Sequence, residues 1–289
     1  EGVVEPGPEW KKQGESHDGT YDTMIYYKID SQTHHLTARI ETPIDKSLLV
    51  PLLSVFNETE LYTTFFPSFD GFLGLDRCDK LRQQGRCNQL LVATTNLPWP
   101  IAKRECLIDV VAIDDVDANG TIIVKMETGK DDDPDAPPVE KGAVRIDFEG
   151  GILFRKCPKD HASLKKSKKK KKRDSTTTTS SDDGAENDDD NIDSTSEDDN
   201  DDADNDGDDE DMILVCMTLS VDPKMKYVPN SLVNFVTRTV LGRMWHAMLQ
   251  VAEDVRDGKR PAHKKAIEDK KEFLYDWVDQ RAQVMLSGM

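Results

Sequence analysis

Hydrophobic and polar residues alternate with a period of two along several short segments, which is the pattern of half-buried β-strands. Residues 24–30 and 35–42 predict a hairpin. Residues 105–113 and 121–127 flank Asn119-Gly120, a dipeptide typical of tight hairpin turns because both residues tolerate positive φ. Further strands are expected at residues 89–95, 143–148, 151–156 and 212–221, with 143–148 and 151–156 as another pair. Seven or eight sequential strands with short connections favour an antiparallel sheet.

Helical spacing of apolar residues follows the last strand. Residues 230–255 carry a broad apolar stripe that must lie against a large apolar surface. A further amphipathic helix is expected at residues 263–286, and a shorter one at 46–56, which Asp45 can cap and Pro51 would kink or shorten. We therefore predict an α+β fold, with a long C-terminal helix across one face of an antiparallel sheet.

Charge changes this picture at one place. The 289 residues carry a formal net charge of −18, and residues 159–211 alone hold nine basic and 20 acidic side chains. That segment contains a basic run at 165–173, a Ser/Thr tract and an Asp-rich stretch, a composition that predicts disorder. A folded domain tolerates such an insert because loop-closure entropy grows only slowly with length. We expect one domain formed by residues 9–158 and 212–257, an insert at 159–211 and an additional helix within 258–289.

The sequence offers little sign of catalysis or metal binding. The five cysteines lack zinc-site spacing and are interpreted as free thiols in a reducing, intracellular compartment. Two strings, at 115–120 and 202–207, resemble the start of a calcium loop, but its twelfth position is Met126 or Ile213 rather than glutamate. We expect no cofactor and no metal. We also expect no specific nucleic-acid partner, because the net charge is negative. An enzyme is the weakest alternative, with His246 as its candidate catalytic residue.

Three motifs in order resemble those of START (steroidogenic-acute-regulatory-related lipid transfer) domains. Leu97-Pro98-Trp99-Pro100 followed by Lys103-Arg104-Glu105 is similar to the family's LPWPxxxRD segment. Residues 141–145 (KGAVR) are similar to its KGxVR strand, and residues 222–234 to its DPxGxxPxxLVN helix start. The resemblance spans about residues 21–255. It implies a helix-grip fold, in which a curved sheet wraps around the C-terminal helix and encloses a lipid cavity. Some sterol-binding members carry a cavity arginine at the position of Val110.

The resemblance also implies a function. Family members bind or transfer sterols, glycerophospholipids or sphingolipids without covalent chemistry, so the expected partners are a phospholipid, sphingolipid or sterol and, transiently, a membrane reached from the cytoplasm. Opening of the long helix or adjoining loops would admit the lipid. A sensor or scaffold that acts through its charged insert is the alternative.

Candidate cavity residues follow from the apolar faces of the predicted strands and the long helix; plain core packing is the alternative for each. They are Cys106, Ile108, Val110, Val124, Ile146, Phe148, Phe235, Val236, Met244, Trp245 and Met248.

Polar candidates for a lipid head group are Arg104, Glu105, Asp109 and Arg145, unless they form surface or interstrand pairs. The basic run at 165–173 is interpreted as an anionic-membrane contact, a nuclear-localisation-like patch or a spacer. Ser180, Thr195 and Ser196 precede acidic residues by three positions, which suits an acid-directed kinase.

Overall fold

The computed structural model describes residues 9–16, 22–30, 35–66, 74–97, 102–164, 212–222, 224 and 240–288. Most of the expected insert, residues 165–211, lies outside this part of the chain, and so do residues 230–239 of the expected long helix. The START-like segments at 98–101 and 225–234 lie outside it as well.

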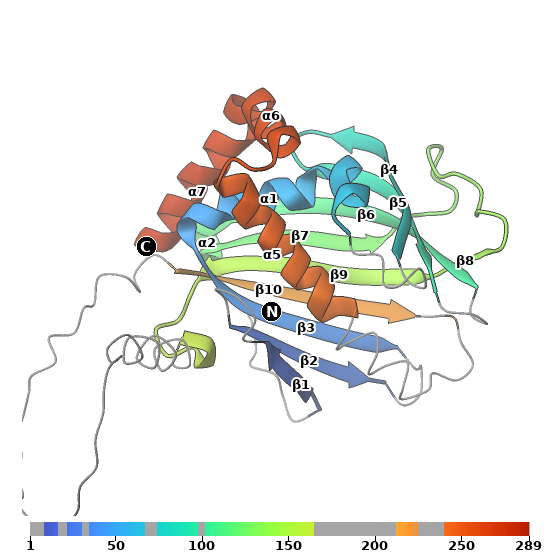
Figure 1. The fold of residues 1–289 in the computed structure, drawn as a ribbon, viewed down its shortest axis with the longest axis horizontal. Coiled ribbons are helices and arrows are strands. Elements are labelled where there is room, and N and C mark those ends of the chain that lie inside the picture. Colours follow the sequence, from blue (N-terminus) through green and yellow to red (C-terminus); the bar gives the residue numbers. More distant parts are fainter. Residues whose placement is uncertain are drawn as a thin grey trace, which may run out of the picture.

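A ten-stranded sheet forms one layer of the molecule, and helices cover one of its faces (Figure 1). Its strand order is β1-β2-β3-β10-β9-β7-β6-β5-β4, with every pairing in this order antiparallel. The strands are β1 Lys11–Ser16, β2 Thr23–Ile29, β3 Leu36–Asp45, β4 Gly74–Gln84, β5 Asn88–Asn96, β6 Lys103–Asp115, β7 Thr121–Thr128, β8 Ala143–Arg145, β9 Asp147–Lys156 and β10 Met212–Asp222.

The predicted hairpins β2–β3 and β6–β7 are confirmed. The second turns through one short helix, α2 Val116–Asn119, and Gly120 follows it with a φ of +64°. The predicted pairing of 143–148 with 151–156 is wrong. The short β8 pairs in parallel with β6, and β9 runs through both ranges to pair with β7 and β10. Because Gly150 and Gly151 lie within β9 without a turn, they continue the strand instead of reversing it.

Helices gather on the face of the sheet that Figure 1 shows in front. They are η1 Lys46–Leu48, α1 Leu49–Asn57, η2 Thr59–Thr64, α5 Gly242–Arg256, α6 Pro261–Asp269, η4 Lys271–Tyr275 and α7 Asp276–Ser287. Asp45 caps the first turn as expected, because its Oδ1 accepts a hydrogen bond from the Ser47 N–H at 2.8 Å. Pro51 does not break α1, because it lies in the first turn, where the N–H that proline lacks has no intrahelical acceptor.

Helix α5 packs its buried face on the sheet through Trp245, which is 1% exposed. The indole N–H of Trp245 donates to Thr42 Oγ1 on β3 at 2.8 Å, and the Trp245 ring stacks on Phe56 of α1. On β10, the sequence left open which face points inward. Ile213, Val215 and Met217 join this core, so this face is the helix-covered one.

The opposite face of β10 contributes to a second, smaller cluster. Leu214 and Cys216 pack there with Cys157 and Leu164. Leu164 is 7% exposed, so the packed chain continues six residues into the range that we assigned to the insert. His161 Nε2 lies 3.5 Å from Glu41 Oε2 on β3 and fixes the same segment to the sheet.

The expected helix at 263–286 is interrupted. Helix α6 ends at Asp269, Lys270 leaves helical geometry with φ −110° and ψ 11°, and the chain resumes through η4 into α7. Leu274, Val278 and Met285 of this segment are buried in the main core, as the apolar pattern predicts.

Candidate functional site

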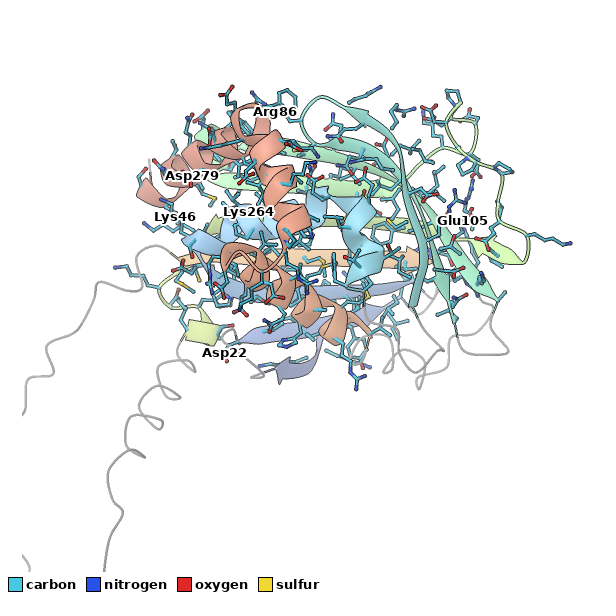
Figure 2. All side chains as sticks on the ribbon, turned by 45° about the horizontal axis from the view of Figure 1, so that its top comes forward. Asp22, Lys46, Arg86, Glu105, Lys264 and Asp279 are labelled. Carbon is cyan, nitrogen blue, oxygen red and sulfur yellow. The ribbon has the colours of Figure 1, made fainter. Side chains whose placement is uncertain are left out.

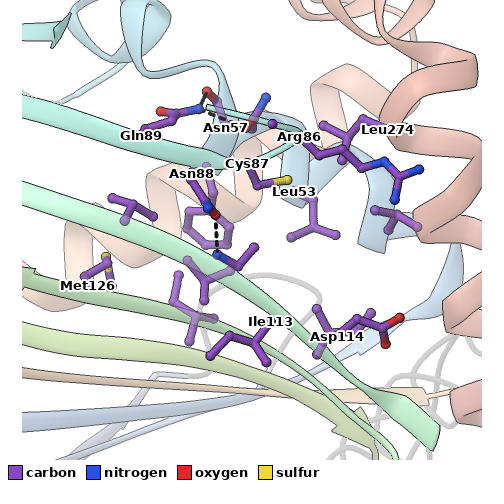
Figure 3. A pocket seen from close by; sticks show the side chains of 18 of the residues that line it. Leu53, Asn57, Arg86, Cys87, Asn88, Gln89, Ile113, Asp114, Met126 and Leu274 are labelled. Atoms are coloured by element: carbon purple, nitrogen blue, oxygen red, sulfur yellow. Dashed lines mark hydrogen bonds between the residues drawn. The ribbon is translucent and has the colours of Figure 1, made fainter. Parts of the chain in front are cut away.

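A cavity of about 380 Å³ lies between the sheet and the helices that cover it (Figure 3). This volume falls within the range of small-molecule binding pockets. Its walls come from α1, the turn between β4 and β5, strands β5, β6, β7 and β9, and the C-terminal η4–α7 segment.

The floor of the cavity is an apolar patch of neighbouring strands. Ile108, Val110 and Ala112 of β6 face it, and the register places Ala112 opposite Val124 of β7 and Val110 opposite Met126. Ile152 of β9 extends the row, since it pairs with Val124. The face of β6 that the sequence selected is therefore the face that lines the cavity.

Three of the eleven candidate residues line this cavity, namely Ile108, Val110 and Val124. The other described candidates are not among the lining residues. Trp245 and Met248 are buried in the main core, and Ile146 is buried outside the lining. Cys106, Phe148 and Met244 are partly buried, also outside it. Phe235 and Val236 lie outside the described residues.

The helical wall was not among the predicted site residues. Leu53 and Phe56 of α1 supply one part, and Leu274, Trp277 and Val278 supply another. The last three belong to residues 258–289, which we expected to be an addition to the domain. Their apolar spacing was visible in the sequence, but nothing local indicates that the chain folds back over the β6–β7 hairpin.

Polar side chains around the apolar wall pair mostly with one another. Gln89 Nε2 donates to the Asn57 carbonyl and to Asn57 Oδ1, each at 2.9 Å. The Tyr62 hydroxyl donates to the Phe56 carbonyl at 2.9 Å. These side chains are therefore satisfied, and the wall offers little polarity to a ligand in the interior of the cavity.

A buried carboxylate fixes the C-terminal segment to α1. Glu58 accepts hydrogen bonds from Lys270 Nζ at 2.7 and 2.8 Å, from the Tyr275 hydroxyl at 3.0 Å and from Asn57 Nδ2 at 2.9 Å. Burial opposes ionisation of Glu58, but these hydrogen bonds and the Lys270 charge outweigh it, so the pKa of Glu58 is lowered. Because Tyr275 lines the cavity, this contact positions part of its wall.

Exposed residues form the rim of the cavity, which consists of Gln84, Gly85, Arg86, Asn88, Ile113 and Asp114. Arg86 extends from the β4–β5 turn toward the C-terminal helices (Figure 3). Its Nε donates to the Phe273 carbonyl at 2.7 Å, and its guanidinium lies 4.7 Å from the centre of the Trp277 ring.

The head-group candidates proposed from the sequence do not line the cavity. Arg145 Nη2 instead pairs with the fully buried Glu105 at 2.6 Å and holds β8 against β6. Figure 2 places Glu105 well away from Arg86, toward the other end of the sheet. Arg104 is buried and donates to the Ala102 carbonyl at 2.7 Å.

Other chemistry is sparse in the part of the chain that the structure describes. No group of three or more His, Cys, Asp or Glu side chains there could hold a metal ion. All five cysteines carry free thiols, and burial raises the pKa of Cys87, which lines the cavity, to about 11. His246 is exposed on α5 and does not face the cavity. Among the described helices, none is long and apolar enough to span a membrane.

No family model and no curated protein matches the sequence. Solved structures do match in fold. Human STARD10 has a TM-score of 0.52 at 11% identity, over 88% of this chain and 77% of that one. A STAR-related lipid transfer protein (fragment 25–204) from Xanthomonas axonopodis has a TM-score of 0.52 at 14% identity, over 85% and 99%. Human StAR-related lipid transfer protein 5 has a TM-score of 0.51 at 10% identity, over 86% and 89%. The chain therefore has the fold of the StAR-related lipid transfer structures, the helix-grip arrangement that its sequence motifs predict.

Proposed function

We propose that the protein binds a lipid in the cavity and carries it between membranes without covalent chemistry. The observation that carries this proposal is the cavity itself, whose floor and helical wall are apolar while most of the polar groups around it are already paired. Two of the structures with the same fold are named as lipid transfer proteins, which supports the same class of ligand.

Burial of an acyl chain supplies the binding energy. Each methylene removed from water contributes about 0.8 kcal/mol. Ten of them would contribute about 8 kcal/mol before the cost of immobilising the lipid is subtracted. Polar interactions deep in the cavity are not needed for that affinity, in keeping with its apolar floor.

The passage for the lipid lies at the rim, between the β4–β5 turn and the C-terminal segment. Leu274 and Val278 anchor this segment in the core, whereas the side-chain contacts at the edges of the gap are polar. Arg86 binds the Phe273 carbonyl, Lys270 binds Glu58, and Arg281 of α7 binds Asp114 at 2.7 Å. Polar contacts of this kind exchange readily with water, and a membrane surface would supply an apolar environment for the side chains that η4–α7 exposes as it moves outward to admit the lipid.

Two matched substitutions on β6 test the proposal. Val110 points into the cavity, whereas Val111, the next residue, points to the other face of the sheet. Val110→Trp should obstruct the cavity and sharply reduce both co-purification of lipid in native mass spectra and transfer of a fluorescent lipid between liposomes. Val111→Trp should preserve both.

Each alternative has its own outcome. Wild-type protein that carries no lipid after purification and transfers none between liposomes would contradict the proposal, and would favour the sensor or scaffold function. Transfer at the wild-type rate in Val110→Trp, with its folding verified by circular dichroism, would mean that the lipid binds elsewhere.

A further inference from the structure

Arg86 occupies an unusual position for an exposed arginine. It is fixed by three contacts that all use backbone or aromatic atoms: the Phe273 carbonyl, the Trp277 ring at 4.7 Å and the Phe273 ring at 5.7 Å. These contacts use Nε and the face of the guanidinium. They leave the two terminal nitrogens, the ones that grip carboxylates and phosphates in a fork, free for an anion.

The charged groups at the rim differ in how they are paired. Arg86 and Asp114 are the charged residues that line the cavity. Asp114 pairs with Arg281, whose Nε lies 2.7 Å from its Oδ2 and whose Nη2 also pairs with Asp117 at 2.8 Å. Arg86, in contrast, has no carboxylate partner among the described residues. An anion at the rim would thus meet a guanidinium that is not already paired with a carboxylate of the described residues.

A second donor lies at the same rim. Asn88 accepts a long hydrogen bond of 3.4 Å from the Ala112 N–H through its Oδ1 (Figure 3). Its amide N–H groups have no partner among the described residues. The rim therefore offers a guanidinium and an amide above an apolar interior, which is the arrangement that suits an amphiphile with an anionic head.

The size of the cavity limits the apolar part. A dry protein cavity of about 150 Å³ accommodates benzene, which corresponds to about 25 Å³ per carbon atom. At that density, the cavity of about 380 Å³ has room for about 15 carbons. That number matches one acyl chain and falls well short of two.

We propose that the ligand is a single-chain amphiphile with an anionic head, a carboxylate or a phosphate monoester, and that Arg86 binds this head at the rim. The inference rests on the proposed lipid-binding function and narrows it to one ligand class. Phe273, which is 54% exposed, and Trp277 orient the guanidinium for this contact.

Three ligands with the same twelve-carbon chain distinguish the contribution of the head group to affinity from that of the chain. They are laurate, dodecyl phosphate and 1-dodecanol. Their affinities for the full chain are measured by calorimetry or by quenching of tryptophan emission, below the micellar range. Wild-type protein should bind both anions about 10- to 100-fold more tightly than the alcohol, as expected for one charge-assisted contact at an exposed site. This preference should fall with increasing salt.

Arg86→Gln should remove the preference while the affinity for 1-dodecanol stays within about threefold, and Arg86→Lys should restore part of it. Arg77→Gln, on the strand β4 that leads into the turn of Arg86 but outside the cavity lining, is the matched control and should change neither affinity. Replacing Arg86 also removes its contacts with Phe273 and Trp277, which could weaken the binding of every ligand. The ratio of anion affinity to alcohol affinity within one variant is unaffected by such a general loss.

Several outcomes would overturn the inference. If the alcohol binds wild-type protein as tightly as laurate does, or if Arg86→Gln retains the preference, Arg86 does not bind the head group although the cavity still binds a chain. If inorganic phosphate binds as tightly as dodecyl phosphate, the rim is a phosphate site without a lipid. If only two-chain lipids bind, the size argument fails. If no lipid of any class binds, the proposed function fails with it.

Discussion

The contact between Glu58 and the C-terminal segment gives the sharpest stability test. Glu58→Gln retains the shape of the side chain but removes its negative charge. Two carboxylate oxygens now receive hydrogen bonds from Lys270, Tyr275 and Asn57. In the variant, Lys270 loses its counter-charge, and the amide nitrogen of the new glutamine is a donor that faces other donors.

The magnitude follows from burial. The Glu58 side chain is 8% exposed, whereas that of Lys270 is 28% exposed. Removing one partner from a fully buried ion pair costs about 3–5 kcal/mol, and an exposed pair is worth about 0–1 kcal/mol. Because Lys270 can recover part of its hydration, we expect a loss of about 2 kcal/mol in the free energy of unfolding.

Urea unfolding measures the total loss in the free energy of unfolding. Hydrogen exchange of residues 261–287 shows whether this loss falls on the C-terminal segment. The matched control is Glu60→Gln, because Glu60 pairs with Lys80 but its side chain is 54% exposed. We expect the control to lose less than about 1 kcal/mol. Equal losses in both variants, or unchanged exchange at 261–287 in Glu58→Gln, would refute the argument.

The same carboxylate predicts a pH dependence. Its pKa in the folded protein lies below the ordinary value of 4.5, so its contribution to stability is complete above about pH 4.5 and disappears as pH falls through the folded-state pKa. The stability of Glu58→Gln should therefore decline less steeply below pH 4.5 than that of wild-type protein. Parallel pH profiles would contradict this assignment.

Three further substitutions probe other parts of the fold by urea unfolding. Trp245→Phe removes the buried hydrogen bond to Thr42 and should cost about 2 kcal/mol; a cost below about 0.5 kcal/mol would show that water replaces the indole N–H. Gly150→Ala should cost about 1–3 kcal/mol, because a Cβ there would lie 2.7 Å from the Thr218 carbonyl oxygen; a neutral effect would show that β9 can shift. Burial lowers the pKa of His263, whose ring nitrogens have no hydrogen-bond partner among the described residues, so its stabilising contribution is lost as pH falls below 6.5. His263→Phe should make stability less dependent on pH just below pH 6.5, and an unchanged slope there would contradict the burial of a neutral imidazole.

The central strands were predictable because each buries one apolar face. Along β6, positions that are always apolar alternate with positions that are polar or apolar. The structure places the apolar set of Ile108, Val110 and Ala112 toward the cavity. The edge strands β1 and β4 were not predicted. β1 (KKQGES) and β4 (GLDRCDKLRQQ) lie at the two edges of the sheet, where charged side chains discourage pairing with other molecules. Their polarity hides the alternation on which sequence prediction depends.

The cavity was only partly predictable for a different reason. Its floor lies on one hairpin and follows from local alternation, but its far wall depends on where the chain goes after Lys270. Trp277 and Val278 read simply as apolar positions of an amphipathic helix. Arg86 reads as one charge in a polar turn. Arg86 and Trp277 meet at the rim only because of the long-range fold, since they are 191 positions apart in the sequence.

The position of β10 in the sheet has a consequence for synthesis of the protein. β10 lies between β3 and β9, so it joins the sheet β1-β2-β3 to the sheet β9-β7-β6-β5-β4. Until residues 212–222 leave the ribosome, β3 and β9 each lack the strand that pairs with them in the folded protein. The β3–β10 pairing also closes a loop of about 170 residues, which makes it an intrinsically slow step. Protection of those two open edges is therefore a requirement during translation, and the long acidic stretch that precedes β10 prolongs the interval over which it is needed.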